Sequence, residues 1–444
     1  MADIFVSLQD LEERAKPIIS SLTSPTILNK QQLQDSLIDD LIFTAEFSDD
    51  DTTKMAAAET IRKIAPLLEI NSTSTYSLYK AFGEKKIDGF TVPALNIRTL
   101  TYDISQMVFE LMQTHQIGAV IFELARGEID YTHQRPAEYL TAILAGAIKV
   151  GYTGPVFILG DHYQFSQKKF TEDKQAEIEA IQSLIKESLT AGYGNIDIDA
   201  STLVDLSLPR ISDQQKHNSE MTALMTNYIR EIEPEGQTTA IGGEIGHIGD
   251  RNSTVEDFEA FIEEYRKLVH TVGISKVSVQ TGTSHGGTVL PDGTFKDVAI
   301  DFNVLKTIST LARDKYEIGG AVQHGASTLP DTAFDHFVEN KTLEVHLATG
   351  LQNIVYDNLP SDVRQEIYSW ITENLSEERQ PEWNDEQFIY KTRKKALGPF
   401  KELLWSMSQE EKEPILRKLE EHLEIIFKKL NLTATRDKVH AFYQ

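Results

Sequence analysis

Residues 92–124 read VPALNIRTLTYDISQMVFELMQTHQIGAVIFEL: an apolar run, a stretch with apolar positions three and four residues apart, and a second apolar run. Short apolar runs are typical of buried strands, and the three- and four-residue spacing is typical of an amphipathic helix. A strand, a helix and a strand in this order predict a βαβ unit, in which the two strands lie parallel.

The same alternation continues along the chain, with helical stretches between most of the strand-like runs. The eight runs are VPALNI (92–97), GAVIFEL (118–124), PVFIL (155–159), NIDIDAS (195–201), AIGGEI (240–245), KVSVQTG (276–282), GGAVQHG (319–325) and TLEVHLATG (342–350). Eight βα units in about 260 residues predict an α/β fold, the (β/α)8 or TIM barrel. An open doubly wound sheet is the alternative, but no Gly-rich dinucleotide loop follows the first run.

Both ends of the chain have the periodicity of amphipathic helices instead. We therefore expect three parts: an N-terminal helical extension over 1–84, a (β/α)8 catalytic domain over 85–358 and a C-terminal helical extension over 359–444. The extensions are expected to cover the barrel or to form an oligomer contact.

Composition limits the function. The 444 residues carry a formal net charge of −25 and no cysteine, so disulfides and thiolate metal sites are excluded. The electrostatic field of this net negative charge repels nucleic acid and anionic membranes, so neither is an expected partner. Without a secretory signal pattern or an apolar run of about eighteen residues, a cytoplasmic location is expected.

Reacting residues of a TIM barrel lie where the strands end, so the polar residues that end the eight runs are candidates. Five of the twelve histidines lie there or in the loops just after: His162, His247, His285, His324 and His346. Carboxylates end other runs, at Asp161, Asp199 and Glu244. Several imidazoles with nearby carboxylates are typical of a catalytic divalent metal site. The alternative, histidines that only make hydrogen bonds, requires separate coincidences of position.

Two of these histidines begin loops of small residues. His285 is followed by Gly286-Gly287-Thr288, and His324 by Gly325-Ala326-Ser327-Thr328. Glycine lets backbone approach a ligand closely, and successive amides with hydroxyl side chains form an anion cradle. The two loops predict a site that binds metal and phosphate side by side.

Over about residues 88–400 the chain resembles the class II, metal-dependent fructose- and tagatose-bisphosphate aldolase superfamily. The matching segments, in order, are VPALNI, GDHYQ, NIDIDAS, GGEIGHIGD, TGTSHGG, AVQHGAST and VHLATGLQ. The resemblance implies Zn²⁺ or another divalent metal on His162, His285 and His324, with Glu244 and Asp199 at a second or alternative metal position. It also implies a monovalent cation near the phosphate and a homo-oligomer, a dimer or larger.

The resemblance assigns further roles. Asp161 matches the residue that protonates the aldehyde-derived oxygen. The residues matched to substrate or phosphate contacts are Asn96, Gly286, Gly325, Ser327, Thr349 and, more loosely, Arg393.

The chain also departs from the family pattern. His346 replaces the substrate-binding Asn, and Ala348 replaces an Asp of the phosphate loop. The loop that carries a catalytic Glu in part of the family reads Asp250-Arg251-Asn252 here, which makes Asp250 a second catalytic candidate. A long insertion, QFSQKKFTEDKQ (164–175), follows the Asp-His pair.

The resemblance implies an aldolase that cleaves a ketose phosphate or bisphosphate, such as fructose 1,6-bisphosphate, through a metal-stabilised enediolate. Its expected ligand is a small sugar phosphate. Because the substrate contacts differ, two alternatives stay open: a ketose-phosphate epimerase with the same metal chemistry, and a non-catalytic accessory subunit of an aldolase.

Overall fold

The computed structural model describes residues 2–246, 251–282, 300–327 and 329–443. Eight parallel strands form a closed barrel, because the strand order runs β4-β3-β2-β9-β8-β7-β6-β5 and β4 also pairs with β5. These strands are β2 (Val92–Asn96), β3 (Ile121–Ala125), β4 (Gly154–Gln164), β5 (Asn195–Asp199), β6 (Ala240–Glu244), β7 (Lys276–Val279), β8 (Ala321–Gln323) and β9 (Glu344–Leu347). The predicted TIM barrel is confirmed, and each of the eight runs overlaps one strand.

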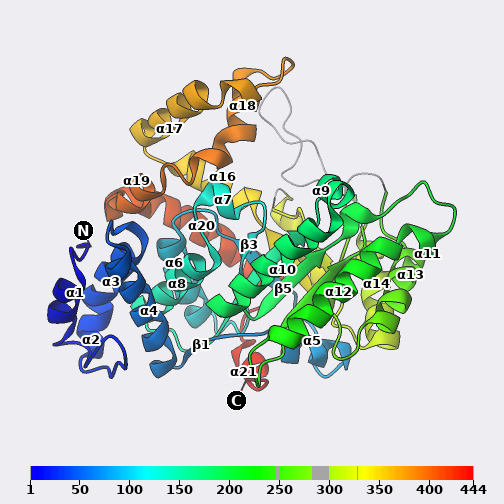
Figure 1. Ribbon diagram of the computed structural model, residues 1–444, viewed down its shortest axis with the longest axis horizontal. Coiled ribbons are helices and arrows are strands. Elements are labelled where there is room, and N and C mark those ends of the chain that lie inside the picture. The colour runs from blue at the N-terminus through cyan, green and yellow to red at the C-terminus, as the bar shows by residue number, and fades with distance from the viewer. Residues whose placement is uncertain (1, 247–250, 283–299, 328, 444) are drawn as a thin grey trace.

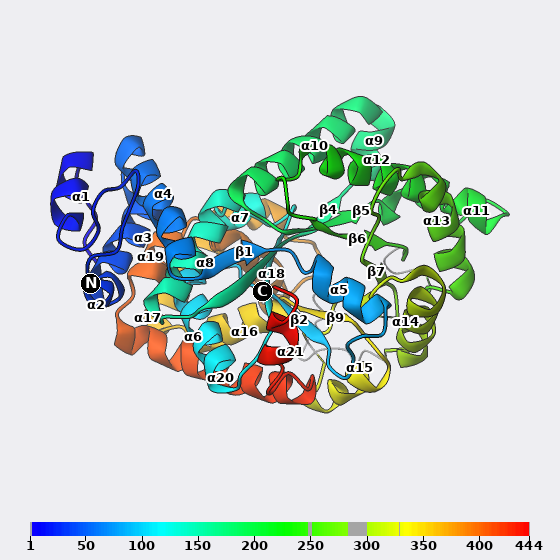
Figure 2. The ribbon, with the colours of Figure 1, turned by 90° about the horizontal axis from the view of Figure 1, so that it is seen from below.

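Helices surround the barrel, as the view along it shows (Figure 2). The longer ones between and after the strands are α6 (Thr101–Thr114), α8 (Pro136–Lys149), α10 (Lys174–Ala191), α12 (Lys216–Ile232), α13 (Val255–Leu268), α14 (Phe302–Tyr316) and α16 (Thr349–Asn358). Shorter helices lie in the loops: α7 (Ile129–Thr132), α9 (Gln167–Glu172), α11 (Ile211–Gln214) and α15 (Asp335–Glu339).

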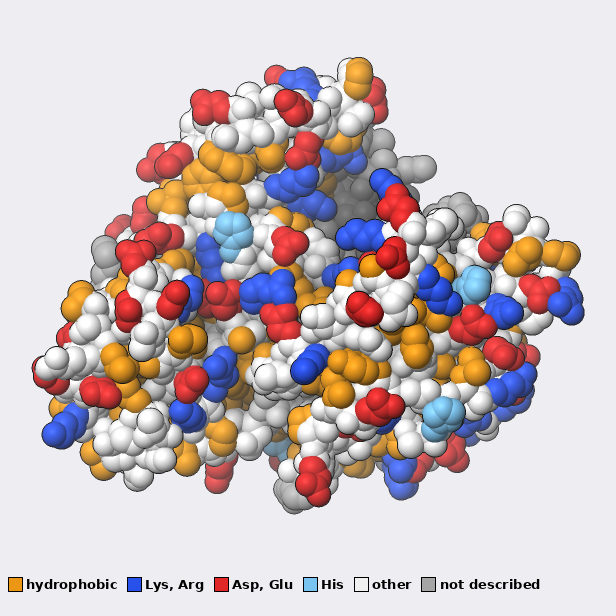
Figure 3. Space-filling view, viewed as in Figure 1, with side chains coloured by type: hydrophobic (Ala, Val, Ile, Leu, Met, Phe, Trp, Pro, Cys, Tyr) orange, Lys and Arg blue, Asp and Glu red, His pale blue; other side chains and the backbone are white. Residues whose placement is uncertain are grey.

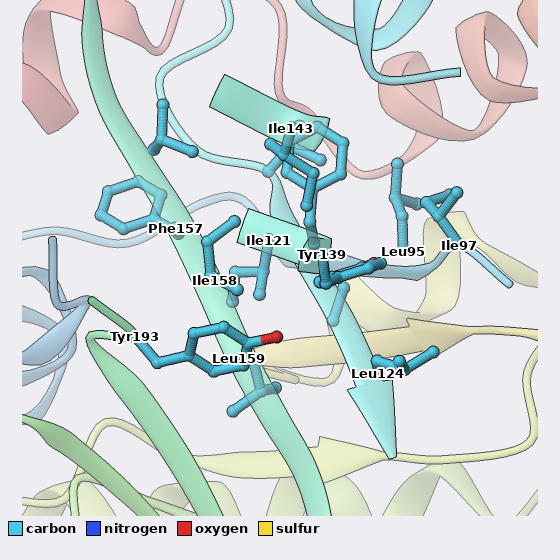
Figure 4. Close-up of a cluster of buried hydrophobic side chains, with 14 of the residues drawn as sticks. Leu95, Ile97, Ile121, Leu124, Tyr139, Ile143, Phe157, Ile158, Leu159 and Tyr193 are labelled. Atoms are coloured by element: carbon cyan, nitrogen blue, oxygen red, sulfur yellow. The ribbon is translucent and has the colours of Figure 1, made fainter. Parts of the chain in front are cut away.

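Apolar side chains pack on both faces of strands β3 and β4. Figure 4 shows Ile121, Phe157 and Ile158 of strands β3 and β4 beside Ile143 and Tyr139 of helix α8. All five side chains are buried, and the Tyr139 hydroxyl donates a hydrogen bond to the carbonyl oxygen of Glu123 at 2.7 Å. The burial of these apolar side chains holds β3 and β4 in place, and with them the strand ends where the candidate residues lie.

The N-terminal segment is mostly helical, as expected, with one difference. It forms α1 (Leu8–Ala15), α2 (Lys30–Gln32), α3 (Ile38–Phe47), α4 (Asp51–Leu67) and α5 (Tyr76–Gly83), and also a short strand, β1 (Ile70–Thr73). Strand β1 pairs in parallel with the first half of β4, from Ile70 opposite Gly154 to Thr73 opposite Phe157. Gly194 lets this strand approach, since a Cβ there would lie 2.3 Å from the Thr73 carbonyl oxygen. A four-residue strand is too short to show a period in the sequence.

The C-terminal segment forms the expected helices: α17 (Ser361–Asn374), α18 (Asp385–Thr392), α19 (Lys401–Ser406), α20 (Gln409–Lys429) and α21 (Arg436–His440). Helices α17 and α18 stand above the carboxyl ends of the strands (Figure 1), whereas α20 packs on α6 and α16. A buried ion pair between Lys412 and Asp103, 3.0 Å long, joins α20 to α6. The part boundaries at 84/85 and 358/359 stay a prediction. None of the described helices has the length and apolar character needed to cross a membrane.

Candidate metal centre

The end of strand β4 carries the Asp161-His162 pair on an irregular backbone. The register between β4 and β5 shifts between Gly160 and Tyr163, and His162 has a φ of +41°. Non-glycine residues rarely adopt positive φ, and bulges of this kind turn a side chain toward a site next to the strand. The shift therefore directs His162 toward the carboxylates of the neighbouring strands.

His162 is the centre of a group of side chains from three strands and from the loop after β8. Its Nδ1 lies 3.1 Å from Asp199 Oδ2 and 3.2 Å from Glu244 Oε2, at the ends of β5 and β6. Its ring centre lies 4.2 Å from that of His324, just after β8. Ligand atoms of His162, Glu244 and His324 all lie within 4.8 Å of one another, so this group could hold a metal ion.

The charges of this group are strongly coupled. Burial acts to lower the pKa of His162, but Asp161 and Glu244 outweigh it and raise the pKa well above its usual value. Burial and the charge of Asp199 raise the pKa of Glu244 to about 7. Burial also acts to raise the pKa of Asp199, but its hydrogen bond with His162 lowers it overall. Imidazole nitrogens and buried carboxylate oxygens are donors that suit a divalent cation, so the residues present fit one.

Part of the expected site cannot be placed. The predicted ligand His285, the phosphate-binding candidate Gly286 and the catalytic candidate Asp250 lie outside the described residues. The structure thus brings together two of the three predicted histidines with both predicted carboxylates.

Beneath His324, the barrel interior contains a second polar group. His346 of β9 lies between two glutamates, with Nδ1 2.6 Å from Glu123 and Nε2 2.6 Å from Glu344. Its ring centre is 4.2 Å from that of His324. Glu344 also pairs with Lys276 and accepts a hydrogen bond from Tyr79. His346, predicted as a substrate contact, is thus held at both ring nitrogens by carboxylates.

A further carboxylate completes this interior group. Asp197 Oδ2 lies 2.8 Å from Lys276 Nζ. Burial raises the pKa of Asp197 to about 6 and that of Glu123 to about 7. Burial acts in the same direction on Glu344, but Lys276 outweighs it and the pKa of Glu344 falls to about 2.

Sequence analysis did not assign a role to Asp197, Glu344 or Lys276. Two of them could have been found from the period of a strand, since residues two apart share a face. Asp197 stands two residues before Asp199, and Glu344 two residues before His346.

Two segments that carry predicted phosphate contacts meet above strands β8 and β9. Gly325 has a φ of +70°, a backbone conformation that glycine adopts most easily. Ser327 lies two residues further along the chain. Thr349 begins helix α16, and the next residue, Gly350, packs so closely that a Cβ there would lie 2.1 Å from the Ser327 carbonyl oxygen. The loops that contain three predicted phosphate-binding residues therefore lie side by side.

The last two predicted substrate contacts are both hydrogen bonded within the protein. The Asn96 amide donates to Glu128 at 2.7 Å and accepts from Arg98 at 3.0 Å. Arg393 is buried, with its guanidinium 4.7 Å from the ring centres of both Tyr356 and Tyr390. Phosphate binding by Arg393 stays a prediction.

The described geometry has the character of a metal-dependent TIM-barrel site, and a comparison with protein families agrees. The model of the family fructose-bisphosphate aldolase class-II matches residues 77–411. The chain belongs to this family. The resemblance inferred from the sequence is confirmed, and the candidate metal centre of this family member lies on β4, β5, β6 and the loop after β8. No curated protein sequence matches the chain.

Solved structures match the chain at low identity, two of them with a TM-score above 0.5. A fructuronate-tagaturonate epimerase from Cohnella laeviribosi is 12% identical, with 87% of this chain and 86% of that chain covered and a TM-score of 0.52. A probable tagatose 6 phosphate kinase from Sinorhizobium meliloti is 13% identical, with 80% and 99% covered and a TM-score of 0.51. A fructose-bisphosphate aldolase from Campylobacter jejuni is 18% identical, with 84% and 99% covered and a TM-score of 0.48.

Proposed function

We propose that the chain is a metal-dependent aldolase that cleaves the C3–C4 bond of a ketose phosphate, with His162, His285 and His324 as the ligands of Zn²⁺ or another divalent metal. The observation that carries this proposal is the group around His162, which has two carboxylates within 3.2 Å of Nδ1 and the His324 ring 4.2 Å away. Membership of the class II aldolase family supports it.

When bound, the metal supplies a Lewis acid that polarises the ketose carbonyl and stabilises the negative charge left after cleavage. The protein supplies the proton transfer. Asp161 is 4% exposed, with Oδ1 3.6 Å from His346 Nδ1 and Oδ2 3.9 Å from His162 Nε2. From this position we assign to Asp161 the proton transfer at the aldehyde-derived oxygen. The loops that contain Gly325, Ser327 and Thr349 are proposed to hold the phosphate next to the metal.

A second candidate is a ketose epimerase that uses the same bond cleavage but rejoins the fragments with the opposite configuration at C4. The observation in its favour is the position of His346. An Asn at this place in the family contacts substrate, whereas both ring nitrogens of His346 contact Glu123 and Glu344. A substrate contact of the family is therefore replaced, which suits a reaction with a different outcome at C4.

Product analysis separates these candidates. The zinc-loaded protein is incubated with fructose 1,6-bisphosphate, tagatose 1,6-bisphosphate and tagaturonate, and the products are resolved by NMR. Triose products support the aldolase, and an isomeric ketose supports the epimerase. Protein that cannot be loaded with zinc and forms neither product would instead support the accessory-subunit alternative.

An Asp161→Asn variant is expected to lower kcat by about 10²–10⁴-fold, because general acid–base catalysis contributes about this much. Bound metal is expected to be unchanged, since the proposed ligands remain. Steady-state kinetics and elemental analysis measure the two quantities. Asp314→Asn is the control, because that side chain is 52% exposed on α14, where it pairs with Lys85. Equal kcat values for the two variants would remove Asp161 from the mechanism.

A further inference from the structure

The polar group in the barrel interior is set apart from the charges on the outside of the protein. Figure 3 shows Asp, Glu, Lys and Arg side chains spread over the surface of the molecule. Beneath His324, by contrast, Lys276 and Glu344 are both fully buried within the barrel. A buried charge has to be held by fixed partners, so each contact of this group determines where its side chains lie.

One of these contacts comes from outside the barrel. Tyr79 belongs to helix α5, which precedes the first barrel strand and lies at the amino end of the barrel, opposite α17 and α18 (Figures 1 and 2). Its side chain is buried, and its hydroxyl donates a hydrogen bond to Glu344 Oε2. Among the described residues, Tyr79 is the one that donates to this oxygen, since the other contacts of Glu344 are made by Oε1.

The backbone before Tyr79 is fixed to the barrel at two further places. Strand β1 pairs with β4 just before α5 begins. Thr75 then donates two hydrogen bonds, from its amide and from its hydroxyl, to Asn195 Oδ1 at 2.8 Å each. Asn195 in turn donates to the carbonyl oxygen of Ile158 at 2.9 Å. The hydroxyl of Tyr79 is therefore presented to Glu344 from a rigid support.

From Glu344 the contacts continue toward the metal centre. Glu344 Oε1 lies 2.6 Å from His346 Nε2. The other ring nitrogen, Nδ1, lies 2.6 Å from Glu123 and 3.6 Å from Asp161 Oδ1. Asp161 Oδ1 is buried and accepts no hydrogen bond from any described residue. The position of Asp161 therefore depends on the His346 ring beside it, and the direction of that ring depends on Glu344.

We propose that Tyr79 is a positioning residue for the reaction at the metal centre. Its hydroxyl fixes the Glu344 carboxylate, this carboxylate orients the His346 ring, and the ring keeps Asp161 in place. The inference rests on the proposed function, since it concerns the proton transfer assigned to Asp161. It gives the N-terminal extension a part in the reaction in addition to covering the barrel.

Loss of the hydroxyl would leave Glu344 Oε2 buried without a donor, which is an unfavourable state. Lys276 and His346 both contact the other oxygen, so the carboxylate is expected to turn until both oxygens share the ammonium group. The His346 ring then loses its fixed acceptor. A change in a residue that orients the groups around a metal typically alters activity about 10–100-fold.

The test compares Tyr79→Phe with Tyr152→Phe in the full-length, zinc-loaded protein. Tyr152 is the matched control, because it is also buried and its hydroxyl donates to the Pro155 carbonyl oxygen at 2.9 Å, while its ring packs on Phe109. The substrate is whichever of fructose 1,6-bisphosphate, tagatose 1,6-bisphosphate and tagaturonate the parent protein converts fastest. We expect Tyr79→Phe to lower kcat about 10–100-fold with KM and bound metal unchanged, and Tyr152→Phe to leave all three unchanged.

A double-mutant cycle with His346→Asn tests whether Tyr79 acts through His346. Once His346 is replaced, Tyr79→Phe is expected to cause no further loss of kcat, because the connection to Asp161 is already broken. Equal kcat values for Tyr79→Phe and Tyr152→Phe would overturn the proposal. Losses for Tyr79→Phe and His346→Asn that multiply in the double variant would also overturn it, since the two residues would then act independently.

An NMR measurement on protein with isotope-labelled histidine gives a result without turnover. The ring nitrogen signals of His346, assigned by their absence in His346→Asn, are expected to shift in Tyr79→Phe and to stay in place in Tyr152→Phe. Unchanged signals in Tyr79→Phe would overturn the proposal. A shift in a protein that forms no product would refute the proposed function and leave the positioning of His346 by Tyr79 intact.

Discussion

Replacing His324 with alanine is expected to remove most of the bound metal and to lower turnover at least about a thousandfold. His324 is 7% exposed, and its ring lies 4.2 Å from the rings of both His162 and His346. It also belongs to both groups of described side chains that could hold a metal ion. Metal catalysis contributes several kcal/mol, and about 4 kcal/mol corresponds to a thousandfold change in rate.

The measurement is metal content by elemental analysis, together with product formation from the best ketose found. His217→Ala is the control, because His217 is 54% exposed on α12 and pairs with Glu220 away from the site. A His324→Ala protein that keeps a full equivalent of metal and normal turnover would contradict the proposed ligand set. Loss of metal with turnover retained would show that the reaction does not depend on this centre.

The barrel could be predicted because the apolar residues of its strands and helices follow regular patterns in the sequence. Each strand is a short buried run, each long helix repeats its apolar positions, and the alternation of the two occurs eight times. Strand β1 has no such pattern in the sequence. Its four residues pair with β4 through backbone hydrogen bonds, which almost any residue can make. The space for it depends on Gly194, far along the chain.

The side chains of the candidate metal centre could be predicted for a related reason. Residues that end the parallel strands of a barrel converge at one end of it. His162, Asp199, Glu244 and His324 could therefore be grouped from the sequence alone. The shift of register that turns His162 toward Asp199 could not be read from the sequence, because a bulge depends on how two strands pair.

The barrel interior below the centre was less accessible to sequence analysis. Lys276 begins its strand rather than ending it, so a search of strand ends passes over it. Its partners Asp197 and Glu344 lie on β5 and β9, and only the closed barrel brings them together. A buried charge is recognised from its partners, which are set by tertiary structure.

Lys276→Met is expected to lower the free energy of unfolding by about 3–5 kcal/mol, because removing one partner of a buried ion pair leaves an uncompensated charge. Lys276 is 1% exposed, and Asp197 and Glu344 would both lose its ammonium group. The side chains around the pair have little space to rearrange, because the backbone at Gly242 packs closely against Asp197 and Lys276. A Cβ at Gly242 would lie 2.3 Å from Asp197 Oδ1 and 3.0 Å from Lys276 Cε.

Urea denaturation followed by circular dichroism measures the effect, with Lys267→Met as the control. Lys267 is 67% exposed and pairs with Glu264 at 2.8 Å on the surface of α13, so its replacement is expected to cost about 0–1 kcal/mol. Similar stabilities for the two variants would mean that water or a proton satisfies Asp197 and Glu344 without the ammonium group. A large loss for Lys276→Met alone would show that the polar barrel interior beneath His324 depends on one buried cation.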